Sequence, residues 1–386
     1  MEKKLRLFFI LVVLVALIVA IWGCYPYPSE DNTKMADYKT LESAPLSPVV
    51  SPLSPQTLAC QTFIDNQLTS PQGGIYTNYQ STSQIENLST GHEILSESMG
   101  LLLEYARLTE NQPLFDETAD YIQTHLIIDA ILLWRIVENG DLITDVSATI
   151  DDLRIYQTLT QAKKKWPLND SATKIFETLE SQLPTKGFQN GYLVNYYSAG
   201  SPTEDKTVEV AYLNLAAIQT LAAARPETAE AVEINQQILL GSFISETLPL
   251  YYKSYDPQKG TYRNTGGKVN ILDSLMVMQN LAEVGLYSPQ SLYWLEEKII
   301  SGTLYSNYDP QTGAALDTQE SSAAYGIAAQ IGAVLGNDRL TEHALIQLKK
   351  HQNADQTSPF YGGFGYNDNA YSYDNLQALL GLVYNK

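Results

Sequence analysis

Six glycine-led segments recur along the chain, and each is followed after a short turn by an apolar helical run. Successive helices open roughly fifty to sixty residues apart, which is enough for two helices and their turns. The repeat therefore predicts one closed, all-α ring of helix pairs, with six inner helices that start at one rim. The segments are residues 74–79, 140–145, 191–196, 260–265, 313–318 and 363–368, and the openings lie around Glu93, Thr149, Val208, Asn270, Ser321 and Tyr373.

Apolar periodicity separates inner from outer helices. Mostly apolar runs predict inner helices at 101–108, 153–162, 210–224, 272–282, 323–335 and 375–383. More charged, amphipathic runs predict outer partners at 114–125, 171–183, 228–240, 288–300 and 340–352. The glycine-led segments are too short to build an independent sheet, so we expect strand-like or turn-like connections.

Charge and composition exclude several classes of function. The 386 residues carry a formal net charge of −19, which argues against a nucleic-acid partner because phosphate binding requires Lys and Arg. With two cysteines and four histidines that lack metal spacing, we expect no metal site, no disulfide framework and no cofactor. One uniform repeat favours a single domain, and we expect a monomer.

The N-terminus has the pattern of an export signal. Lys3, Lys4 and Arg6 precede an uncharged apolar run at 7–23, and Cys24 follows it. Residues 21–24 resemble a bacterial lipobox, although Trp22 is large for its position, so a lipoprotein and a retained signal anchor both remain open. Residues 25–55 are rich in Pro and Ser and predict an extended linker. The folded body would occupy residues 56–386, on the outer side of the cell membrane or secreted.

Three carboxylate positions stand out at the helix openings. Thr90 and Glu93 have capping-box spacing, so we expect a helix to start there and Glu97 to lie one turn later, before an apolar run. Burial against apolar neighbours would raise the pKa of the Glu97 carboxyl, as a general acid requires. A surface glutamate is the alternative.

The other two positions are interpreted as anions. Thr149 and Asp152 repeat the capping-box spacing, with Asp151 between them, and Asn270 and Asp273 occupy the same relative positions. A helix dipole stabilises carboxylates in a first turn, so we expect lowered pKa values for Asp152 and Asp273. Helix capping is the structural alternative; a sugar-holding carboxylate and a general base are the functional ones. Asp256 competes for the base role, although its Asp-Pro turn recurs at Asp309.

Part of the chain resembles a known enzyme family. Residues 95–103 (LSESMGLLL) resemble the "SEGxGYGM" segment of glycoside hydrolase family 8, whose Glu is the general acid. Residues 133–136 (LWRI), residues 147–155 (SATIDDLRI) and Trp166 resemble that family's "W…NSATDADLxIAxxL…W" stretch. The resemblance implies an (α/α)6 barrel that acts by inversion on β-1,4-linked glucans, xylans or chitosan. It also implies Glu97 as the acid and Asp151 or Asp152 as the sugar-holding carboxylate.

The chain departs from the family pattern at three points. Ile150 stands where the first Asp of "DAD" would fall, Ser98 replaces the first glycine of the acid segment, and the family's Asp-x-x-Arg base motif is not evident. Asp273 is our choice of base because it opens the fourth inner helix. These departures suit a divergent branch associated with bacterial exopolysaccharides.

The leading hypothesis is an exported, membrane-tethered hydrolase of a β-linked polysaccharide. Glu97 would protonate the leaving oxygen, Asp273 would activate a water and Asp152 would hold the ring. Residues that could also contact the sugar are Asp151, Asn270, Trp134, Tyr197 and Tyr212, the last three as stacking platforms. A polysaccharide lyase on the same barrel and a non-catalytic exopolysaccharide-binding barrel are the alternatives.

Overall fold

The computed structural model describes residues 36–41, 52–81, 89–138, 144–200 and 206–384. All of them lie in one compact unit, Met35–Lys386. The export segment with Cys24 and residues 140–143 of the second glycine-led segment lie outside the described residues. None of the helices within these described ranges combines the length and the apolarity needed to cross a bilayer.

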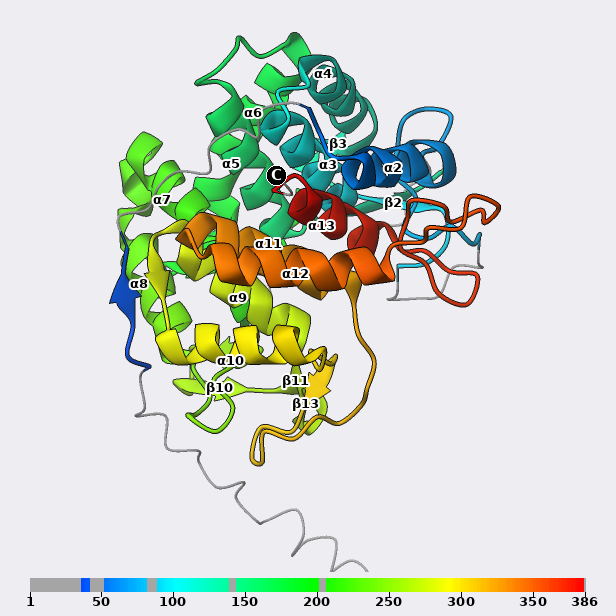
Figure 1. Cartoon of the computed structure of the whole chain (residues 1–386). Coiled ribbons are helices and arrows are strands. Elements are labelled where there is room, and N and C mark those ends of the chain that lie inside the picture. Colours follow the sequence, from blue (N-terminus) through cyan, green and yellow to red (C-terminus); the bar gives the residue numbers. More distant parts are fainter. Residues whose placement is uncertain (1–35, 42–51, 82–88, 139–143, 201–205, 385–386) are drawn as a thin grey trace, which may run out of the picture. The chain divides into compact units, whose positions relative to one another are not determined.

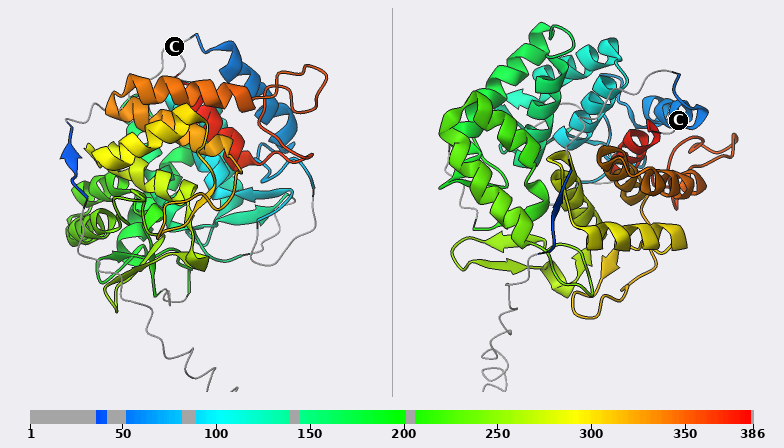
Figure 2. Two further views of the ribbon diagram at one scale, coloured as in Figure 1. Left: turned by 60° about the horizontal axis from the view of Figure 1, so that its bottom comes forward. Right: turned by 60° about the vertical axis from the view of Figure 1, so that its left-hand side comes forward.

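Six apolar helices contact one another in chain order, and the last contacts the first, so they form a closed cycle (Figure 1). Figure 2 shows helices all the way around the unit. The described residues are mostly helical with short strands, as predicted, and these six helices follow one another in the order that the repeat predicts. Its members are α3 (Ser96–Leu108), α5 (Thr149–Ala162), α7 (Leu215–Ala224), α9 (Ile271–Glu283), α11 (Ser322–Leu335) and α13 (Ser372–Leu382).

Six further α-helices of the described residues lie outside this ring, and most of them start at a Ser or Asn whose side chain accepts a hydrogen bond from a first-turn N–H. In α10, for example, Ser288 caps the helix, Pro289 opens it and Gly302 ends it at φ 66°. The outer helices are α2 (Pro55–Phe63), α4 (Gln112–Tyr121), α6 (Asp170–Lys186), α8 (Ala229–Gly241), α10 (Pro289–Ser301) and α12 (Asp338–His351).

The first outer helix packs against the last inner one. The Thr57 hydroxyl of α2 donates a hydrogen bond to the Leu382 carbonyl of α13, at 3.0 Å, across 325 positions of sequence. No outer partner is predicted for α13 from the sequence, and α2 is that partner. The two ends of the folded unit are thereby joined.

Short strands and single turns connect the helices. Antiparallel pairs join β1 (Lys39–Thr40) to β12 (Leu286–Tyr287), β2 (Glu93–Leu95) to β5 (Arg135–Val137), β3 (Ile127–Ile128) to β4 (Ile131–Leu132), β6 (Phe188–Gln189) to β7 (Tyr192–Leu193), and β11 (Val269–Asn270) to β13 (Asn307–Tyr308). A three-stranded sheet has the order β10 (Thr261–Arg263), β9 (Ser254–Asp256), β8 (Val208–Glu209). Single turns are η1 (Ile64–Leu68), η2 (Ile122–Leu126), η3 (Val210–Tyr212), η4 (Pro226–Thr228) and η5 (Thr265–Gly267).

The starts of the inner helices are linked in a circle of hydrogen bonds. At or just before each start, a backbone N–H donates to the segment that precedes the next inner helix, or, for α11, to a side chain of α13. The N-termini of five inner helices, and of η3 ahead of α7, therefore lie at one rim, as the repeat predicts. The bonds are Ser96 N to Trp134 O, Thr149 N to Asn195 O, Val210 N to Lys253 O, Ile271 N to Ser306 O, Ala323 N to Asp374 Oδ1 and Ser372 N to Thr77 O.

Glycines bring α11 and α13 into close contact. A Cβ at Gly326 would lie 2.2 Å from the Gln377 carbonyl oxygen, and a Cβ at Gly381 would lie 2.8 Å from the Gly326 Cα. Only a residue without a side chain fits at such backbone separations. The apolar periodicity of these helices is therefore supplemented by two sterically required glycines.

Two predicted helix starts were wrong. Glu93 lies in β2 and α3 starts at Ser96, because the Glu93 carboxylate is buried beside Arg135, at 3.5 Å, rather than exposed in a first turn. Val208 lies in β8 and α7 starts at Leu215, after the Asn214 cap. Thr90 N–H does donate to Glu93 Oε2, at 3.3 Å, whereas the Thr149–Asp152 capping box does not form: α5 has no side-chain cap, and the Thr149 hydroxyl and the Asp152 carboxyl are buried.

The predicted linker is in part packed on the folded unit. Lys39 and Thr40 pair with β12, and the Tyr38 hydroxyl donates to the Leu240 carbonyl at 2.9 Å. Apolar contact and backbone pairing outweigh the extended tendency of the surrounding Pro- and Ser-rich sequence at this point.

Candidate active site

Glu97 lies in the first turn of α3 at the rim. Its side chain is half-buried, whereas Ser96 and Ser98 on either side are fully buried. Burial raises the pKa of Glu97 from 4.5 to about 7, and the neighbouring Asp151 carboxylate adds to the rise while Arg154 opposes it. The predicted upward shift is therefore present, and the carboxyl can hold a proton near neutral pH.

Asp151 and Arg154 form an ion pair next to Glu97. Arg154 Nη1 lies 2.5 Å from Asp151 Oδ1, and the Ser96 hydroxyl donates to Asp151 Oδ2 at 2.7 Å. The pKa of Asp151 is raised because burial outweighs these contacts. Because the Arg154 guanidinium lies so close to Asp151, it stabilises mainly the Asp151 carboxylate. Glu97 is then the carboxyl that holds the proton.

Asp152 is buried on a different side of α5 from Asp151. Its side chain has no exposure, and burial raises its pKa well above 3.8, although the Tyr197 and Ser147 hydroxyls oppose this rise. The expectation of an ionised Asp152 is thus wrong, because desolvation outweighs the helix dipole. Tyr197 is 2% exposed beside it, so neither side chain is presented to a ligand at the rim.

Asp273 opens α9 and shares one cation with Glu209. Lys253 Nζ lies 3.8 Å from Asp273 Oδ2 and 3.9 Å from Glu209 Oε2. Burial raises the pKa of Asp273 and Lys253 lowers it, with burial the larger effect. The predicted lowering of this pKa is therefore also wrong, although the direction of the Lys253 contribution is the one that an ionised base needs.

Two tyrosines link these groups across the rim. Tyr212, at the end of η3, is close enough to Asp151, Glu209, Glu97 and Asp273 for each to raise its pKa, after the larger effect of burial. Tyr373, in the first turn of α13, has its pKa raised by burial and by the nearby Glu97, while the nearby Arg154 lowers it. The structure thus brings Glu97, Asp151, Tyr212 and Asp273 into one electrostatic cluster.

The remaining candidates have structural contacts. Asn270 caps α9, since its Oδ1 accepts from Leu272 N at 2.8 Å and Asp273 N at 3.3 Å. Trp134 is half-buried under the Arg135 guanidinium, 4.4 Å from the ring centre. Asp256 is buried in its turn, where Lys259 lies 3.0 Å from Oδ2. In the described ranges, no group of three His, Cys, Asp or Glu side chains is arranged to hold a metal ion.

Sequence reasoning missed Arg154, Glu209, Lys253 and Tyr373. The i, i+3 spacing of Asp151 and Arg154 on a predicted helix could have identified their ion pair. Glu209 lies in β8 and Lys253 directly precedes the neighbouring strand β9, and only the fold brings them to Asp273. Tyr373 was recognised as a helix opening but not as a neighbour of Glu97.

No family model matches the chain. It is 25% identical over 349 residues to a Bacillus subtilis protein named "Putative lipoprotein YdaJ", covering 89% of this chain and 90% of that protein. A solved structure described as a novel α-amylase from Clostridium perfringens has a TM-score of 0.78 and 30% identity, covering 86% of this chain and 97% of the other. A GH8 xylanase from Teredinibacter turnerae, in complex with xylohexaose, has a TM-score of 0.57 and 12% identity, covering 85% and 92%; this likeness concerns the fold alone.

Proposed function

The chain belongs to a divergent, family 8-like branch of the glycoside hydrolases, and from this we propose that it hydrolyses a polysaccharide with inversion at the anomeric carbon. The inner and outer helices would form an (α/α)6 barrel whose N-terminal rim holds the chemistry. The observation that carries the proposal is Glu97, a half-buried carboxyl with a pKa of about 7 at that rim.

In the proposed reaction, the protonated Glu97 gives its proton to the glycosidic oxygen as the bond to the anomeric carbon breaks. The Asp273 carboxylate takes a proton from a water that attacks the opposite face of the sugar. An inverting pair leaves room for that water, so a separation of about 6.5–9.5 Å between the two carboxyl groups is expected. Tyr212, half-buried and near both carboxyls, is the proposed sugar contact. Asp151 would set the protonation of Glu97, and the buried Asp152 would support α5.

Replacing Glu97 tests the acid. Glu97→Gln keeps the shape but cannot donate the proton, so release of reducing ends should fall about 100-fold or more. The matched control is Glu297→Gln on the exposed face of α10, which should be fully active. Normal turnover by a folded Glu97→Gln protein would end the assignment. Glycan binding without any reducing ends from the wild type would favour a binding barrel, and absorbance from a new double bond would favour a lyase.

Two lysine replacements test the base. Lys253→Met removes the cation that lowers the pKa of Asp273, so the acid limb of the pH–rate profile should move to higher pH. Lys259→Met removes the nearer of the two cations beside Asp256, at 3.0 Å, with Arg263 left at 3.6 Å, and should leave the acid limb unchanged. The opposite result, a shift with Lys259→Met alone, would transfer the base role to Asp256.

Two substrate classes are proposed. The fold shared with a GH8 xylanase supports a β-linked polymer such as an exopolysaccharide, whereas the 30% identity to a structure described as an α-amylase supports an α-linked glucan. Parallel assays on amylose, xylan and a mixed-linkage β-glucan, with the Glu97→Gln protein as the blank, separate the two. Release from amylose alone would rule out the β-linked proposal.

We also propose that the protein is exported and tethered to the membrane. The relative named as a lipoprotein and the signal-type segment at residues 1–24 support this. Cell fractionation of Cys24→Ala distinguishes the anchors: release from the membrane fraction indicates a lipid on Cys24, and retention indicates an uncleaved apolar helix. Wild-type protein in the cytosolic fraction would contradict both.

A further inference from the structure

A cavity of about 410 Å³ lies inside the ring, lined by residues from all six inner helices. Ile150 and Arg154, in the first two turns of α5, are the lining residues nearest the rim carboxyls, and most other lining residues belong to the C-terminal halves of the helices. Its volume is within the range of about 300–1,000 Å³ that small-molecule sites occupy. None of the rim carboxyls Glu97, Asp151 and Asp273 lines it.

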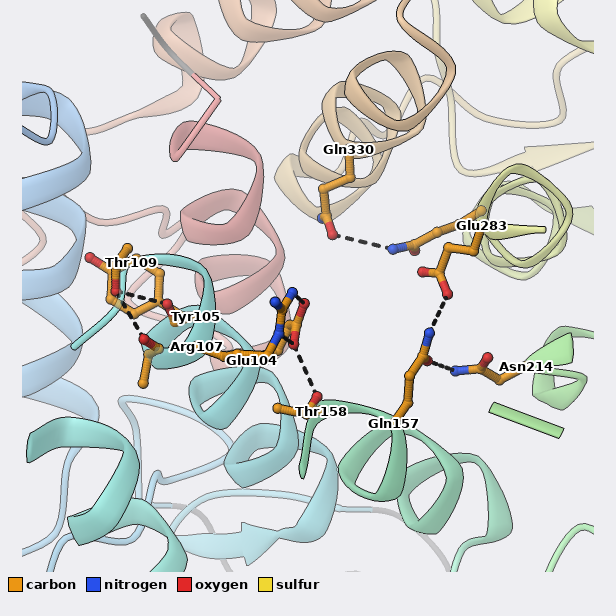
Figure 3. Close-up of polar contacts among 11 residues, drawn as sticks. Glu104, Tyr105, Arg107, Thr109, Gln157, Thr158, Asn214, Glu283 and Gln330 are labelled. Atoms are coloured by element: carbon orange, nitrogen blue, oxygen red, sulfur yellow. Dashed lines mark hydrogen bonds and ion pairs between the residues drawn. The ribbon is translucent and has the colours of Figure 1, made fainter. Parts of the chain in front are cut away.

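On one wall, opposite charges neutralise each other. The Arg107 guanidinium donates to both carboxylate oxygens of Glu104, at 2.5 and 2.7 Å, and the Thr158 hydroxyl donates to Glu104 at 3.0 Å (Figure 3). Arg107 is 3% exposed, so this pair is fixed rather than a mobile surface contact. The wall therefore has polar atoms at defined positions and no net charge.

On the opposite wall the polar groups are mainly amides. Gln157 accepts from Asn214 Nδ2 at 2.7 Å and donates to Glu283 at 3.2 Å, and Gln279 donates to Gln330 at 3.3 Å (Figure 3). Burial raises the pKa of Glu283 to about 7, so its carboxyl both donates and accepts hydrogen bonds near neutral pH. These groups suit a ligand rich in hydroxyls.

Two further features complete the cavity. The Tyr384 hydroxyl is buried without a hydrogen-bond partner among the described residues, and it belongs to the lining. Leu101, Met276, Val334 and Leu380 supply apolar surface. A neutral ligand with hydroxyls on its edges and C–H groups on its faces matches this combination. The two lysines of the lining, Lys164 and Lys165, are exposed and follow the C-terminal end of α5, and Lys165 pairs with Glu110 at 2.9 Å.

We propose that this cavity is a second binding site, separate from the rim, for a neutral saccharide of one or two rings. Its amides and hydroxyls would bond the sugar hydroxyls, and its apolar side chains would cover the ring faces. The proposal depends on the cavity and not on the chemistry at the rim, so a failure of the proposed hydrolase activity would not count against this site.

Calorimetric titration of the Glu97→Gln protein with glucose, maltose and cellobiose tests the proposal without turnover. Ala216→Phe fills the cavity from α7 and should abolish the binding, and Gln279→Leu should weaken it about five-fold through the lost hydrogen bond. Gln219→Leu, on the exposed face of α7, is the matched control and should bind as before.

The outcomes separate the two sites. Binding with unchanged affinity in both cavity variants would mean that the sugars bind only at the rim, and would overturn the proposal. Absence of binding for all three sugars at millimolar concentration would also overturn it and would indicate a cavity filled by water only. If Ala216→Phe does not fold, as shown by its melting temperature, Gln279→Leu decides alone.

Discussion

Replacing Asp151 by Asn should move the alkaline limb of the pH–rate profile to lower pH. Activity requires protonated Glu97, and its rise in pKa from 4.5 to about 7 corresponds to about 3 kcal/mol against the ionised form. Asp151 contributes to that rise in two ways. Its carboxylate repels a charge on Glu97, and it holds Arg154 at 2.5 Å, which limits how far the guanidinium can stabilise Glu97. Asn removes both effects while keeping the size of the side chain.

Both changes lower the pKa of Glu97, and a neighbouring charge typically shifts a carboxyl by about one unit or more. With a pKa near 6 instead of 7, the protonated fraction at pH 7 falls from about one half to about one tenth, and kcat/KM should fall in proportion. Reducing-end release measured from about pH 5 to pH 9 gives the limb directly. Asp309→Asn, in an exposed turn, is the matched control. An alkaline limb that stays in place, or that moves to higher pH, would refute the coupling of Asp151 to Glu97.

Two predictions concern stability. The folded pKa of Asp152 is raised above its unfolded value, so its contribution to the free energy of unfolding is complete below about pH 4 and is lost as the pH rises towards the folded pKa. The melting temperature of Asp152→Asn should therefore depend less on pH than that of the wild type. The same pH dependence of the melting temperature in both proteins would contradict this. Gly326→Ala should lower the free energy of unfolding by about 1–3 kcal/mol because its Cβ meets the Gln377 carbonyl. Gly200→Ala, with open space around it, should change little in the same denaturant titration.

The repeat made the ring predictable because it is encoded locally. Glycine-led turns and apolar runs with helical spacing recur in each unit, so the inner helices α5, α9, α11 and α13 start within a residue or two of the predicted openings. The starts of α3 and α7 were wrong because tertiary pairing decides them. Glu93 is held by Arg135 on β5, and Val210 by the Lys253 carbonyl, and both partners lie more than forty residues further along the chain, before the next inner helix.

The protonation states were only partly predictable. A helix dipole acts within one turn and can be inferred from sequence, but desolvation depends on the whole packed unit. Asp152 and Asp273 occupy first-turn positions that favour anions, yet burial raises both pKa values. For Glu97, the apolar burial expected from the sequence and the burial in the structure both raise the pKa. The acid was therefore predicted more successfully than its partners.

The arrangement of cations explains how one rim could hold both an acid and a base. On one side, Arg154 lies 2.5 Å from Asp151, so most of its stabilisation goes to that carboxylate and Glu97 keeps its proton. On the other side, Lys253 lies at nearly equal distances from Asp273 and Glu209, 3.8 and 3.9 Å, so its charge is shared between them. Because Lys253 is shared, the ionised form of Asp273 is stabilised less by its cation than the ionised form of Asp151 is by Arg154. A carboxylate that is stabilised less is the better proton acceptor. Glu209→Gln should therefore leave the Lys253 charge to Asp273 alone, and the acid limb of the pH–rate profile should move to lower pH, opposite to the shift expected for Lys253→Met.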